Sequence, residues 1–384
     1  MAEYGKPRIA HVTSGLLRGG AETFLTRVAS ATRDEFEHVI YPLRSGPMAE
    51  PARGAGATVS EAPATLGPFR LAANWINAAM RMRSRAALLQ GWMYNGNIMA
   101  TLFSSGTPVL WNIRHTLDNT AAENLRTRAA IRLSLAISGR PDGIIYNARR
   151  GAVTHEAYGY PAEKRLIIPN GFDTDCFRPD PHWRAEARAG LGLTEADTLV
   201  GRFCRNDSMK DHATLFDAFR RILDGMPNAR LALAGYGMTQ ADKKLAGDAR
   251  RAGVHERVLF LGERDDIPRL MTAVDLMLST SNRGEGFPNV IGEAMSCGVP
   301  VVATDAGDSA EIIADPSYVC RIGDAEAIAA RASAILSETA EARVKRGAAL
   351  RQRIVESYSL DEAARQYASL WRRVIRERRK GSTV

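Results

Sequence analysis

The sequence predicts an α/β protein with two doubly wound parallel sheets. Short apolar segments rich in β-branched residues alternate with helix-length segments along the chain, which is typical of parallel sheets covered by helices on both faces. The chain has 384 residues, which is long enough for two domains with cores of ordinary size. Its 45% of hydrophobic and 24% of charged residues are values of a globular protein.

The first half of the chain contains segments with the composition of β-strands, separated by segments with helical periodicity. Strands are predicted over residues 8–14, 37–43, 57–62, 87–92, 108–115, 143–148 and 165–171. Helices are predicted from Ala21, after residue 43, over 70–83, from Asn95, over 121–137 and after residue 148. This order predicts a parallel sheet, because each helix returns the chain to the start of the next strand.

The second half repeats the pattern after a turn-rich segment, 168–183, that contains Asn-Gly and three prolines. Strands are predicted over 198–204, 229–237, 258–262, 275–280 and 299–305, and helices over 213–223, from Thr239, over 267–274 and from Asn289. We therefore predict a first domain over 1–175, a second over 176–358, and a basic helix over 359–384 that packs back on the first domain. Sheets of this type bind ligands beyond the carboxyl ends of their strands.

The composition argues against several classes of protein. No apolar run approaches 18 residues and the first residues lack the apolar core of a signal peptide, so we expect a cytoplasmic protein. The four cysteines show no CxxC spacing, which argues against a zinc site or a disulfide framework.

The net charge of +8 is unevenly distributed. Residues 1–178 contain 21 lysines and arginines against 14 acids, residues 179–358 contain 23 against 26, and residues 359–384 contain 7 against 3. The excess in the first half and the tail favours contact with an anionic membrane surface or with phosphates, although solubility explains it equally well.

Two places in the first domain have the residues of a binding site. Gly19 and Gly20 stand in a loop between a strand and a helix, where main-chain N–H groups and the helix N-terminus favour a phosphate. The alternative is that they only form a tight turn. His115 follows an apolar strand and would project from its carboxyl end, with a structural role as the alternative.

In the second domain, Arg202, Arg205 and Lys210 lie where a strand gives way to a loop and a helix. Fixed cations at this edge would neutralise a diphosphate, arginine as a planar fork and lysine as a point charge. Cations on an ordinary solvated surface are the alternative.

The segment "EGFPNVIGE" follows a second strand of this domain. Pro288 suits the start of a helix, where its missing N–H costs nothing, and the N–H groups of Phe287, Asn289 and Val290 would bind ligand oxygens. Glu293 is placed to accept hydrogen bonds from a ribose diol, and Glu285 to contact sugar hydroxyls. Alternatively, both acids only stabilise the helix N-terminus.

Residues 285–313 resemble the donor-site signature of family 4 glycosyltransferases of the GT-B fold. In that family, two glutamates separated by seven residues open the last strand–helix segment of the nucleotide-sugar domain. The resemblance continues, in the family's order, through residues 19–22, 111–116, 168–179, 205–219, 231–237 and 258–271. It implies a GT-B architecture, in which two Rossmann-like domains face each other across a cleft.

The resemblance also implies a role for each candidate residue. Arg205 and Lys210, with a contribution from Arg202, would neutralise the diphosphate of a nucleotide sugar. Glu293 would bind the ribose, and Glu285 would hold the sugar together with the main chain of Phe287, Pro288, Asn289 and Val290. The main chain near Arg264 would lie against the base, while Gly19 and Gly20 would contact the diphosphate and His115 the sugar.

The family retains the anomeric configuration and needs no metal ion or other cofactor, and the sequence has no Asp-x-Asp pair placed to hold a metal beside the diphosphate. Catalysis would then depend on positioning and electrostatic stabilisation, with Arg205, Lys210 and the glycine-loop N–H groups in place of a metal. We expect a UDP-sugar as donor.

Residues 89–103 and the His115 segment resemble enzymes that build bacterial surface polysaccharides, which implies a saccharide or lipid-linked acceptor. A docking face on the anionic inner membrane is predicted over 70–85 with Arg126, Arg128 and Arg132. The alternatives are a nucleotide-sugar 2-epimerase of the same fold and a nucleotide-binding protein without catalysis. No motif indicates a nucleic-acid partner.

Overall fold

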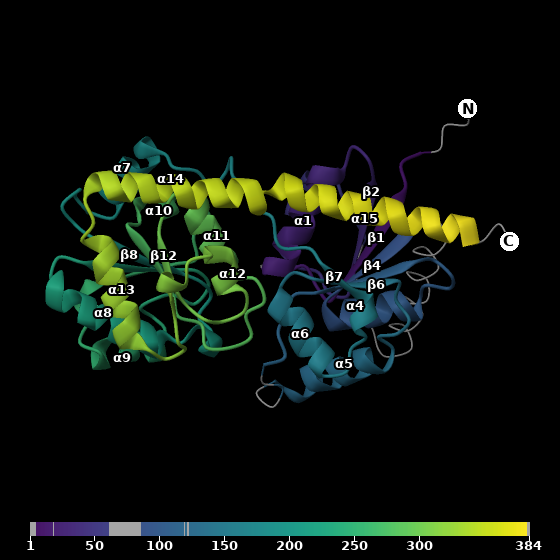
Figure 1. The fold of residues 1–384 in the computed structure, drawn as a ribbon, viewed down its shortest axis with the longest axis horizontal. Coiled ribbons are helices and arrows are strands. Elements are labelled where there is room, and N and C mark those ends of the chain that lie inside the picture. The colour runs from purple at the N-terminus through teal and green to yellow at the C-terminus, as the bar shows by residue number, and fades with distance from the viewer. Residues whose placement is uncertain (1–4, 18, 61–85, 119, 121–122, 382–384) are drawn as a thin grey trace. The chain divides into compact units, whose positions relative to one another are not determined.

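The protein divides into two units, which we describe separately. The structure, a computed structural model, describes residues 5–17, 19–60, 86–118, 120 and 123–381 (Figure 1). The first unit comprises residues 1–171 and 360–384, and the second comprises residues 172–359. The sequence placed these boundaries at 175/176 and 358/359. The helix predicted over 70–83 and the arginine-rich run 70–85 lie outside the described residues.

The first unit is built on a parallel sheet with the strand order β3-β2-β1-β4-β5-β6-β7. Its strands are β1 Arg8–Thr13, β2 Glu37–Pro42, β3 Thr58–Val59, β4 Leu88–Trp92, β5 Val109–Ile113, β6 Gly143–Tyr146 and β7 Arg165–Ile167. Each strand predicted in the described residues of this half is present. The order reverses between β1 and β4, so the loops that follow these two strands meet at the carboxyl edge.

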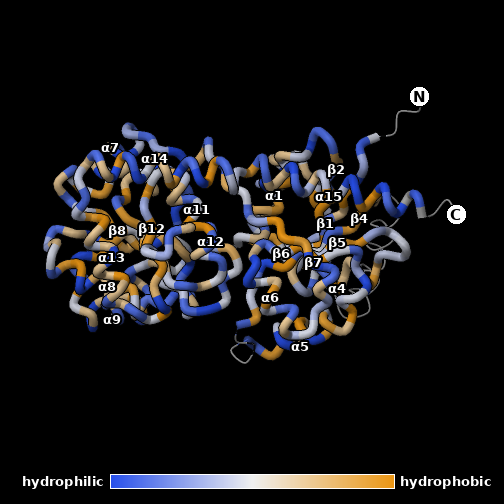
Figure 2. The backbone as a smooth tube through the Cα atoms, viewed as in Figure 1, coloured by the Kyte–Doolittle hydropathy of each residue, from blue (hydrophilic) through white to orange (hydrophobic). Residues whose placement is uncertain are grey.

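Helices cover both faces of this sheet. They are α1 Gly20–Thr32, α2 Ala49–Gly54, α4 Met93–Leu102, α5 Leu125–Ala136, α6 Arg149–Ala157 and α15 Leu360–Gly381. One apolar cluster joins β1, β4 and β5 to α1 and α15, and another joins the same sheet to α4, α5 and α6. The hydrophobic residues follow the strands in the interior of the unit (Figure 2). The helix predicted over 121–137 begins at Leu125, because Asn124 caps it by accepting a hydrogen bond from the Thr127 N–H at 2.9 Å.

The last helix, α15, belongs to the first unit although 188 residues of the second unit precede it. It lies beside α1 (Figure 1). Two buried polar contacts fix its register: the Asn112 side chain donates to the Tyr367 hydroxyl at 2.6 Å, and the Trp371 indole donates to Gln90 Oε1 at 2.6 Å. Because a buried donor left without its acceptor is costly, these contacts specify which face of α15 meets the sheet.

The second unit has a parallel sheet with the order β10-β9-β8-β11-β12-β13. Its strands are β8 Leu199–Phe203, β9 Arg230–Ala234, β10 Val258–Gly262, β11 Leu276–Ser279, β12 Val301–Thr304 and β13 Val319–Cys320. Here the order reverses between β8 and β11. The loops that follow these two strands therefore flank the topological switch point, where doubly wound sheets bind ligands.

The helices of the second unit are α7 Pro181–Gly190, α8 His212–Gly225, α9 Lys243–Arg251, α10 Ile267–Ala273, α11 Asn289–Ser296, α12 Ser309–Ile313, α13 Ala325–Leu336 and α14 Ala340–Ser357. The helix predicted from Thr239 begins later, at Lys243, because Asp242 is its N-cap and accepts from the Leu245 N–H at 2.9 Å. Strand β13 is too short, at two residues, to give a periodic signal. In neither unit is any described helix long and apolar enough to cross a membrane.

Candidate functional site

The loops after β8 and β11 are joined by a buried arginine. Arg202, the fourth residue of β8, is 1% exposed and donates to the Lys210 carbonyl at 2.9 Å and to the Ser279 hydroxyl at 3.2 Å. It also reaches the Ser281 hydroxyl at 3.4 Å. The sequence placed Arg202 among the ligand contacts. The structure instead buries its side chain beneath the two loops, so that it supports Lys210 and is itself shielded from a ligand.

Lys210 and Glu285 form an ion pair at this edge, with side chains 16% and 13% exposed. Both the Lys210 ammonium and the Ser281 hydroxyl donate to Oε1 of Glu285, the latter at 2.6 Å. Burial raises the pKa of the Glu285 carboxyl, but Lys210, Ser281 and Arg202 outweigh that effect and lower it below its usual value. Glu285 is therefore ionised at neutral pH, and no described residue is hydrogen-bonded to its second oxygen.

Main-chain and side-chain hydrogen bonds hold the two loops in register. The Asn282 N–H donates to the Met209 carbonyl at 2.8 Å, and the Arg283 guanidinium donates to the Ser208 hydroxyl at 2.9 Å. The Thr280 hydroxyl donates to the Lys210 carbonyl at 3.0 Å. Because both loops are fixed to one another and not only to their own strands, Lys210 and Glu285 are positioned as one rigid pair.

An aromatic cluster holds the segment between Glu285 and α11. Phe287 is buried and stacks on Phe172 with centroids 5.9 Å apart, and Tyr358 packs against it with centroids 5.4 Å apart. Gly292 in α11 lies directly against the Phe172 ring, where an added Cβ would overlap the ring atoms. Any side chain at this position would therefore force α11 away from Phe172.

Helix α11 begins immediately after this cluster. Pro288 is its N-cap, one position before the first helical turn in which the sequence placed it. Asn289 and Val290 form the start of the helix and are half-buried, as is Glu293 one turn later. The arrangement brings Glu285, Phe287, Pro288, Asn289 and Val290 into one continuous loop and helix start, as the motif predicted.

The Arg205 side chain is more exposed to solvent than that of Lys210. It is 59% exposed and lies 3.4 Å from the Asp207 carboxylate. It stands beside the glycine-bounded turn of Tyr236, because the neighbouring Asn206 N–H donates to the Tyr236 carbonyl at 2.7 Å. Tyr236 is 73% exposed and was not selected from the sequence. The Gly235 N–H on its other side donates to the Gly262 carbonyl at 2.7 Å, which places Tyr236 between the loops after β8 and β10.

Arg264 lies in the loop after β10. Its guanidinium forms a bidentate ion pair with the Asp266 carboxylate: Nε donates to Oδ1 at 2.7 Å and Nη2 donates to Oδ2 at 2.5 Å. The hydrogen bond raises the pKa of Arg264 and lowers that of Asp266. The Arg264 side chain, although paired with Asp266 in this way, remains 38% exposed.

In the first unit, Gly19 is the N-cap of α1 and Gly20 its first residue. Gly19 has φ −149°, which other residues also adopt, so the backbone does not require glycine here. An added Cβ would lie 2.5 Å from the Glu22 carboxylate, the flexible end of a side chain that can turn aside. An acid folded over this helix start competes with any bound phosphate.

His115 lies just after β5, with its side chain 17% exposed. Its Nε2 is 3.3 Å from the Glu123 carboxylate, and its Nδ1 is 3.3 Å from the Tyr94 hydroxyl. Tyr94 in turn contacts His155 Nε2 at 2.9 Å. His115 is therefore the outer member of a chain of polar side chains, and neither Tyr94 nor His155 was selected from the sequence.

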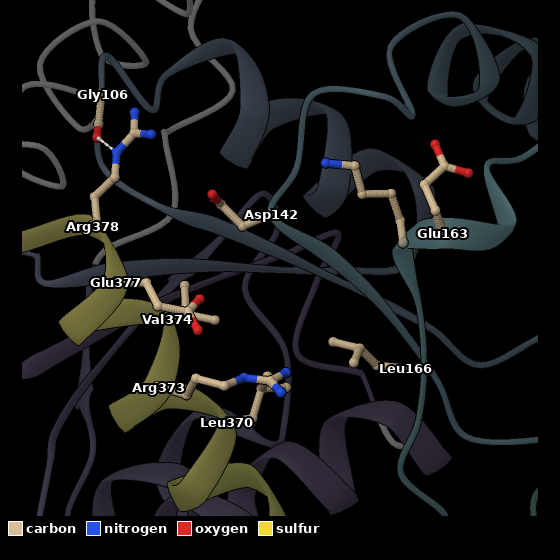
Figure 3. Close-up of a pocket in the computed structure, with 10 residues that line it drawn as sticks. Gly106, Asp142, Glu163, Leu166, Leu370, Arg373, Val374, Glu377 and Arg378 are labelled. Atoms are coloured by element: carbon tan, nitrogen blue, oxygen red, sulfur yellow. Dashed lines mark hydrogen bonds between the residues drawn. The ribbon is translucent and has the colours of Figure 1, made fainter. Parts of the chain in front are cut away.

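The first unit also has a cavity of about 720 Å³ at the edge of the sheet next to α15 (Figure 3). Three cations and three acids contribute to its lining, with apolar side chains between them, and none of the predicted site residues is among them: Gly106, Asp142, Glu163, Lys164, Leu166, Leu370, Arg373, Val374, Glu377 and Arg378. Its mixed charge favours no single class of ligand.

Comparison with known proteins shows which enzymes this chain resembles. Residues 198–338, most of the second unit, match the family model described as "Glycosyl transferases group 1". Two curated proteins extend the match. The lipopolysaccharide core biosynthesis mannosyltransferase LpsB of Rhizobium meliloti (strain 1021) is 29% identical over 244 residues, which are 62% of this chain and 67% of LpsB. The putative glycosyltransferase EpsF of Bacillus subtilis (strain 168) is 27% identical over 355 residues, 88% of this chain and 89% of EpsF. The chain therefore resembles the glycosyltransferases of family 4.

Solved structures agree on the fold. The crystal structure of Anabaena Alr3699/HepE in complex with UDP and glucose matches with a TM-score of 0.82 at 24% identity, covering 95% of this chain and 99% of HepE. The predicted GT-B architecture of two Rossmann-like domains is thereby confirmed.

The residues that sequence reasoning missed contact the candidate site residues and have only weak local sequence signals. Ser281, Tyr94 and His155 act through contacts with residues distant in the chain, which no spacing rule reveals. Tyr236 had a signal, since an aromatic residue between two glycines after a buried strand stands exposed at the carboxyl edge.

Proposed function

We propose that this protein is a retaining, metal-independent glycosyltransferase that transfers a sugar from a UDP-sugar to a saccharide or lipid-linked acceptor in bacterial glycan biosynthesis. The observation that carries the proposal is the Lys210–Glu285 pair at the switch point of the second unit. A lysine fixed at this edge suits a diphosphate, and an ionised carboxylate beside it suits sugar hydroxyls. The relatives named in the comparisons are glycosyltransferases, and HepE was crystallised with UDP and glucose.

The proposed roles follow from which polar atoms of these residues already make hydrogen bonds within the protein and which can bind the donor. Glu285 accepts from both Lys210 and Ser281 on Oε1, so Oε2 can accept from a sugar hydroxyl without breaking the ion pair. Lys210 has two further ammonium protons for the diphosphate, and the half-exposed Arg205 can join it. Arg202 keeps the Lys210 carbonyl in place.

At the other end of the donor, the nucleoside would contact α11 and the loops after β9 and β10. Glu293 would accept from the ribose, the main chain near Arg264 would lie against the base, and the exposed Tyr236 would stack on that base. Gly19, Gly20 and His115 of the first unit would contribute to the diphosphate and the sugar.

The proposed chemistry needs no protein nucleophile. Cleavage of the bond between the anomeric carbon and the diphosphate builds positive charge on the sugar and negative charge on the leaving phosphate. Lys210 and Arg205 would stabilise the leaving group, while the acceptor hydroxyl attacks the same face and gives its proton to the departing phosphate.

The donor assignment is tested by thermal shift with UDP, GDP, ADP and their sugar conjugates, with EDTA present. We expect UDP to raise the melting temperature, and the Lys210→Ala variant to lose most of that shift. Release of UDP from a UDP-sugar only when an acceptor is present would separate transfer from 2-epimerisation. A melting temperature unchanged by every nucleotide would contradict the donor site and favour a protein without this catalysis.

We further propose that α5 docks the first unit on an anionic membrane. The helix contains no acid, and its exposed face carries Leu125 (79% exposed), Arg126, Arg132 and Leu133 (52% exposed). Leucines beside arginines on one exposed face match the interface of an anionic bilayer, since the apolar chains insert and the guanidinium groups remain among headgroups.

Flotation with phosphatidylglycerol vesicles tests this docking. The double variant Arg132→Glu/Leu133→Ser should lose most of its binding, and binding of the parent protein should weaken as salt is raised. Arg343→Glu/Val344→Ser on α14 is a matched control, because both residues are exposed there as well. Equal binding to neutral phosphatidylcholine vesicles would contradict the electrostatic part of the proposal.

A further inference from the structure

A continuous chain of polar side chains runs from His115 into the core of the first unit. His115 Nδ1 contacts the Tyr94 hydroxyl at 3.3 Å, the same hydroxyl contacts His155 Nε2 at 2.9 Å, and His155 Nδ1 contacts the Gly151 carbonyl at 2.7 Å. Tyr94 is 5% exposed and His155 is fully buried. Three elements contribute: α4 carries Tyr94, the segment after β5 carries His115, and α6 carries His155.

The donor and the acceptor are fixed in the hydrogen bond at the inner end of this chain. A carbonyl only accepts, so His155 Nδ1 must carry a proton and donate it to Gly151. Burial lowers the pKa of His155 to about 4, so the ring is neutral at physiological pH and its Nε2 has a lone pair. Burial also raises the pKa of Tyr94 well above its usual value, so its hydroxyl keeps its proton.

The donor and acceptor roles in the inner hydrogen bonds also determine those in the contact between Tyr94 and His115. Because His155 Nε2 can only accept, the single hydroxyl proton of Tyr94 points at His155. The lone pairs of the Tyr94 oxygen are left for His115, so His115 Nδ1 must be the donor of their contact. Nδ1 of His115 is therefore protonated, whatever the state of Nε2.

We infer that Tyr94 and His155 are positioning residues that fix the proton of His115 on Nδ1 and so make Nε2 its reactive nitrogen. An isolated neutral imidazole carries its proton on either nitrogen, and only the partner of one nitrogen decides which is free. Nε2 lies 3.3 Å from the Glu123 carboxylate, which stabilises a proton there. His115 can thus present Nε2 either as a lone pair or, when doubly protonated, as a donor.

Helix α6 holds the backbone of the His115 segment as well as His155. The Leu117 N–H donates to the Thr154 hydroxyl at 3.0 Å, and Arg150 pairs with Asp118 at 3.1 Å. The same helix therefore fixes both ends of the contact through Tyr94, which keeps the chain of hydrogen bonds in register.

This inference rests on the proposed function for what Nε2 does, because a sugar or acceptor hydroxyl would be its partner. A hydroxyl that meets a lone pair is oriented as a donor, whereas one that meets N–H is oriented as an acceptor. A ring free to exchange its tautomer would offer the wrong group for part of the time, and turnover would fall accordingly.

The first measurement is the tautomer of His115 itself, by nitrogen NMR of protein labelled with ¹⁵N-histidine. The protein has seven histidines, and the His115→Gln variant assigns the relevant signal. We expect Nδ1 to be protonated both in the neutral and in the charged ring. A neutral His115 with its proton on Nε2 would overturn the inference, and this result needs no variant, substrate or activity.

The second measurement uses Tyr94→Phe, which removes only the hydroxyl. We expect the neutral His115 ring to populate the Nε2–H tautomer, and kcat to fall about tenfold while the KM for the donor stays within about twofold. Tyr160→Phe is the matched control: its ring also packs on His155, at 4.9 Å, but its hydroxyl bonds to Ser134 and Ile131 outside the chain. It should leave both the tautomer and kcat unchanged.

His155 gives an independent series. His155→Leu removes the acceptor of the Tyr94 proton and should act like Tyr94→Phe, whereas His155→Gln can still accept through its amide oxygen and should restore the Nδ1–H tautomer in part. Equal loss in both variants would contradict the inference. Because the NMR result is independent of UDP binding, it separates failure of this inference from failure of the proposed function.

Discussion

Among single residues, replacing Glu285 and replacing Lys210 have different consequences for the ion pair that they form. Glu285→Gln keeps the shape and can still accept from Ser281, but it removes the charge beside Lys210. We expect kcat/KM for UDP-sugar transfer to fall at least about tenfold, measured as acceptor-dependent UDP release. Glu256→Gln, on a side chain 95% exposed, should remain at the parental rate. Near-normal activity of Glu285→Gln would remove Glu285 from the proposed mechanism.

Lys210→Ala leaves a buried carboxylate without its cation. Desolvation would then dominate, so we expect the pKa of Glu285 to rise and activity to fall by at least about tenfold. The melting temperature at neutral pH should fall as well, because the ionised Glu285 has lost its partner. A variant that lost activity while keeping full stability would show that Lys210 serves the substrate and contributes little to the fold.

Tyr236 separates binding from chemistry. If its exposed ring stacks on the base, Tyr236→Ala should raise the KM for the donor about tenfold with little change in kcat, since stacking on a base contributes about 1–3 kcal/mol. Tyr236→Phe should bind as the parent does. A Tyr236→Ala variant with an unchanged KM would place the base elsewhere.

On the scale of elements, the packing of α11 against Phe172 positions the Glu285 loop, which leads directly into this helix. Gly292→Ala places a methyl group 2.1 Å from two atoms of the Phe172 ring, so we expect a loss of about 1–3 kcal/mol in the free energy of unfolding. Gly190→Ala at the end of α7 meets nothing within 4 Å and is the control, expected to be neutral or slightly stabilising. Chemical denaturation of both variants measures the difference.

The loops after β8 and β11 show which features of the candidate site the local sequence pattern predicts and which it does not. Their alternation of strand, loop and helix predicted that Lys210 and Glu285 stand at a carboxyl edge. The pattern contains no information on Arg202, because a charged residue inside an apolar strand looks like a ligand contact until its neighbours are known. Its burial under Ser279, Ser281 and the Lys210 carbonyl follows from the adjacency of β8 and β11, which lie 73 residues apart.

For the molecule as a whole, buried histidines predict a loss of stability in mild acid. Burial lowers the pKa of His38, His155 and His212 from 6.5 to about 4 each. The unfolded chain therefore binds more protons than the folded one between these values, so the free energy of unfolding falls as pH drops from about 6.5 to about 4, by at most about 3 kcal/mol for each histidine.

Thermal melts at a series of pH values would show this loss. His212→Leu should reduce it, because neither ring nitrogen of His212 has a hydrogen-bond partner among the described residues and the replacement takes up no proton. A melting temperature that stayed constant from pH 7 down to about pH 5 would contradict the prediction.

By itself, the sequence determined the α/β class, the strands of the described residues other than β13, and the edge at which the candidate site is proposed. These depend on local periodicity and on turn residues, which each segment carries with it. Only the tertiary structure decided that Arg202 is buried beneath Lys210 and donates to its carbonyl, that α15 joins the first unit through Tyr367 and Trp371, and that Tyr94 connects His115 to His155. Those outcomes depend on which groups a side chain meets across the fold, and hydrogen-bond partners and burial are properties of the packed molecule.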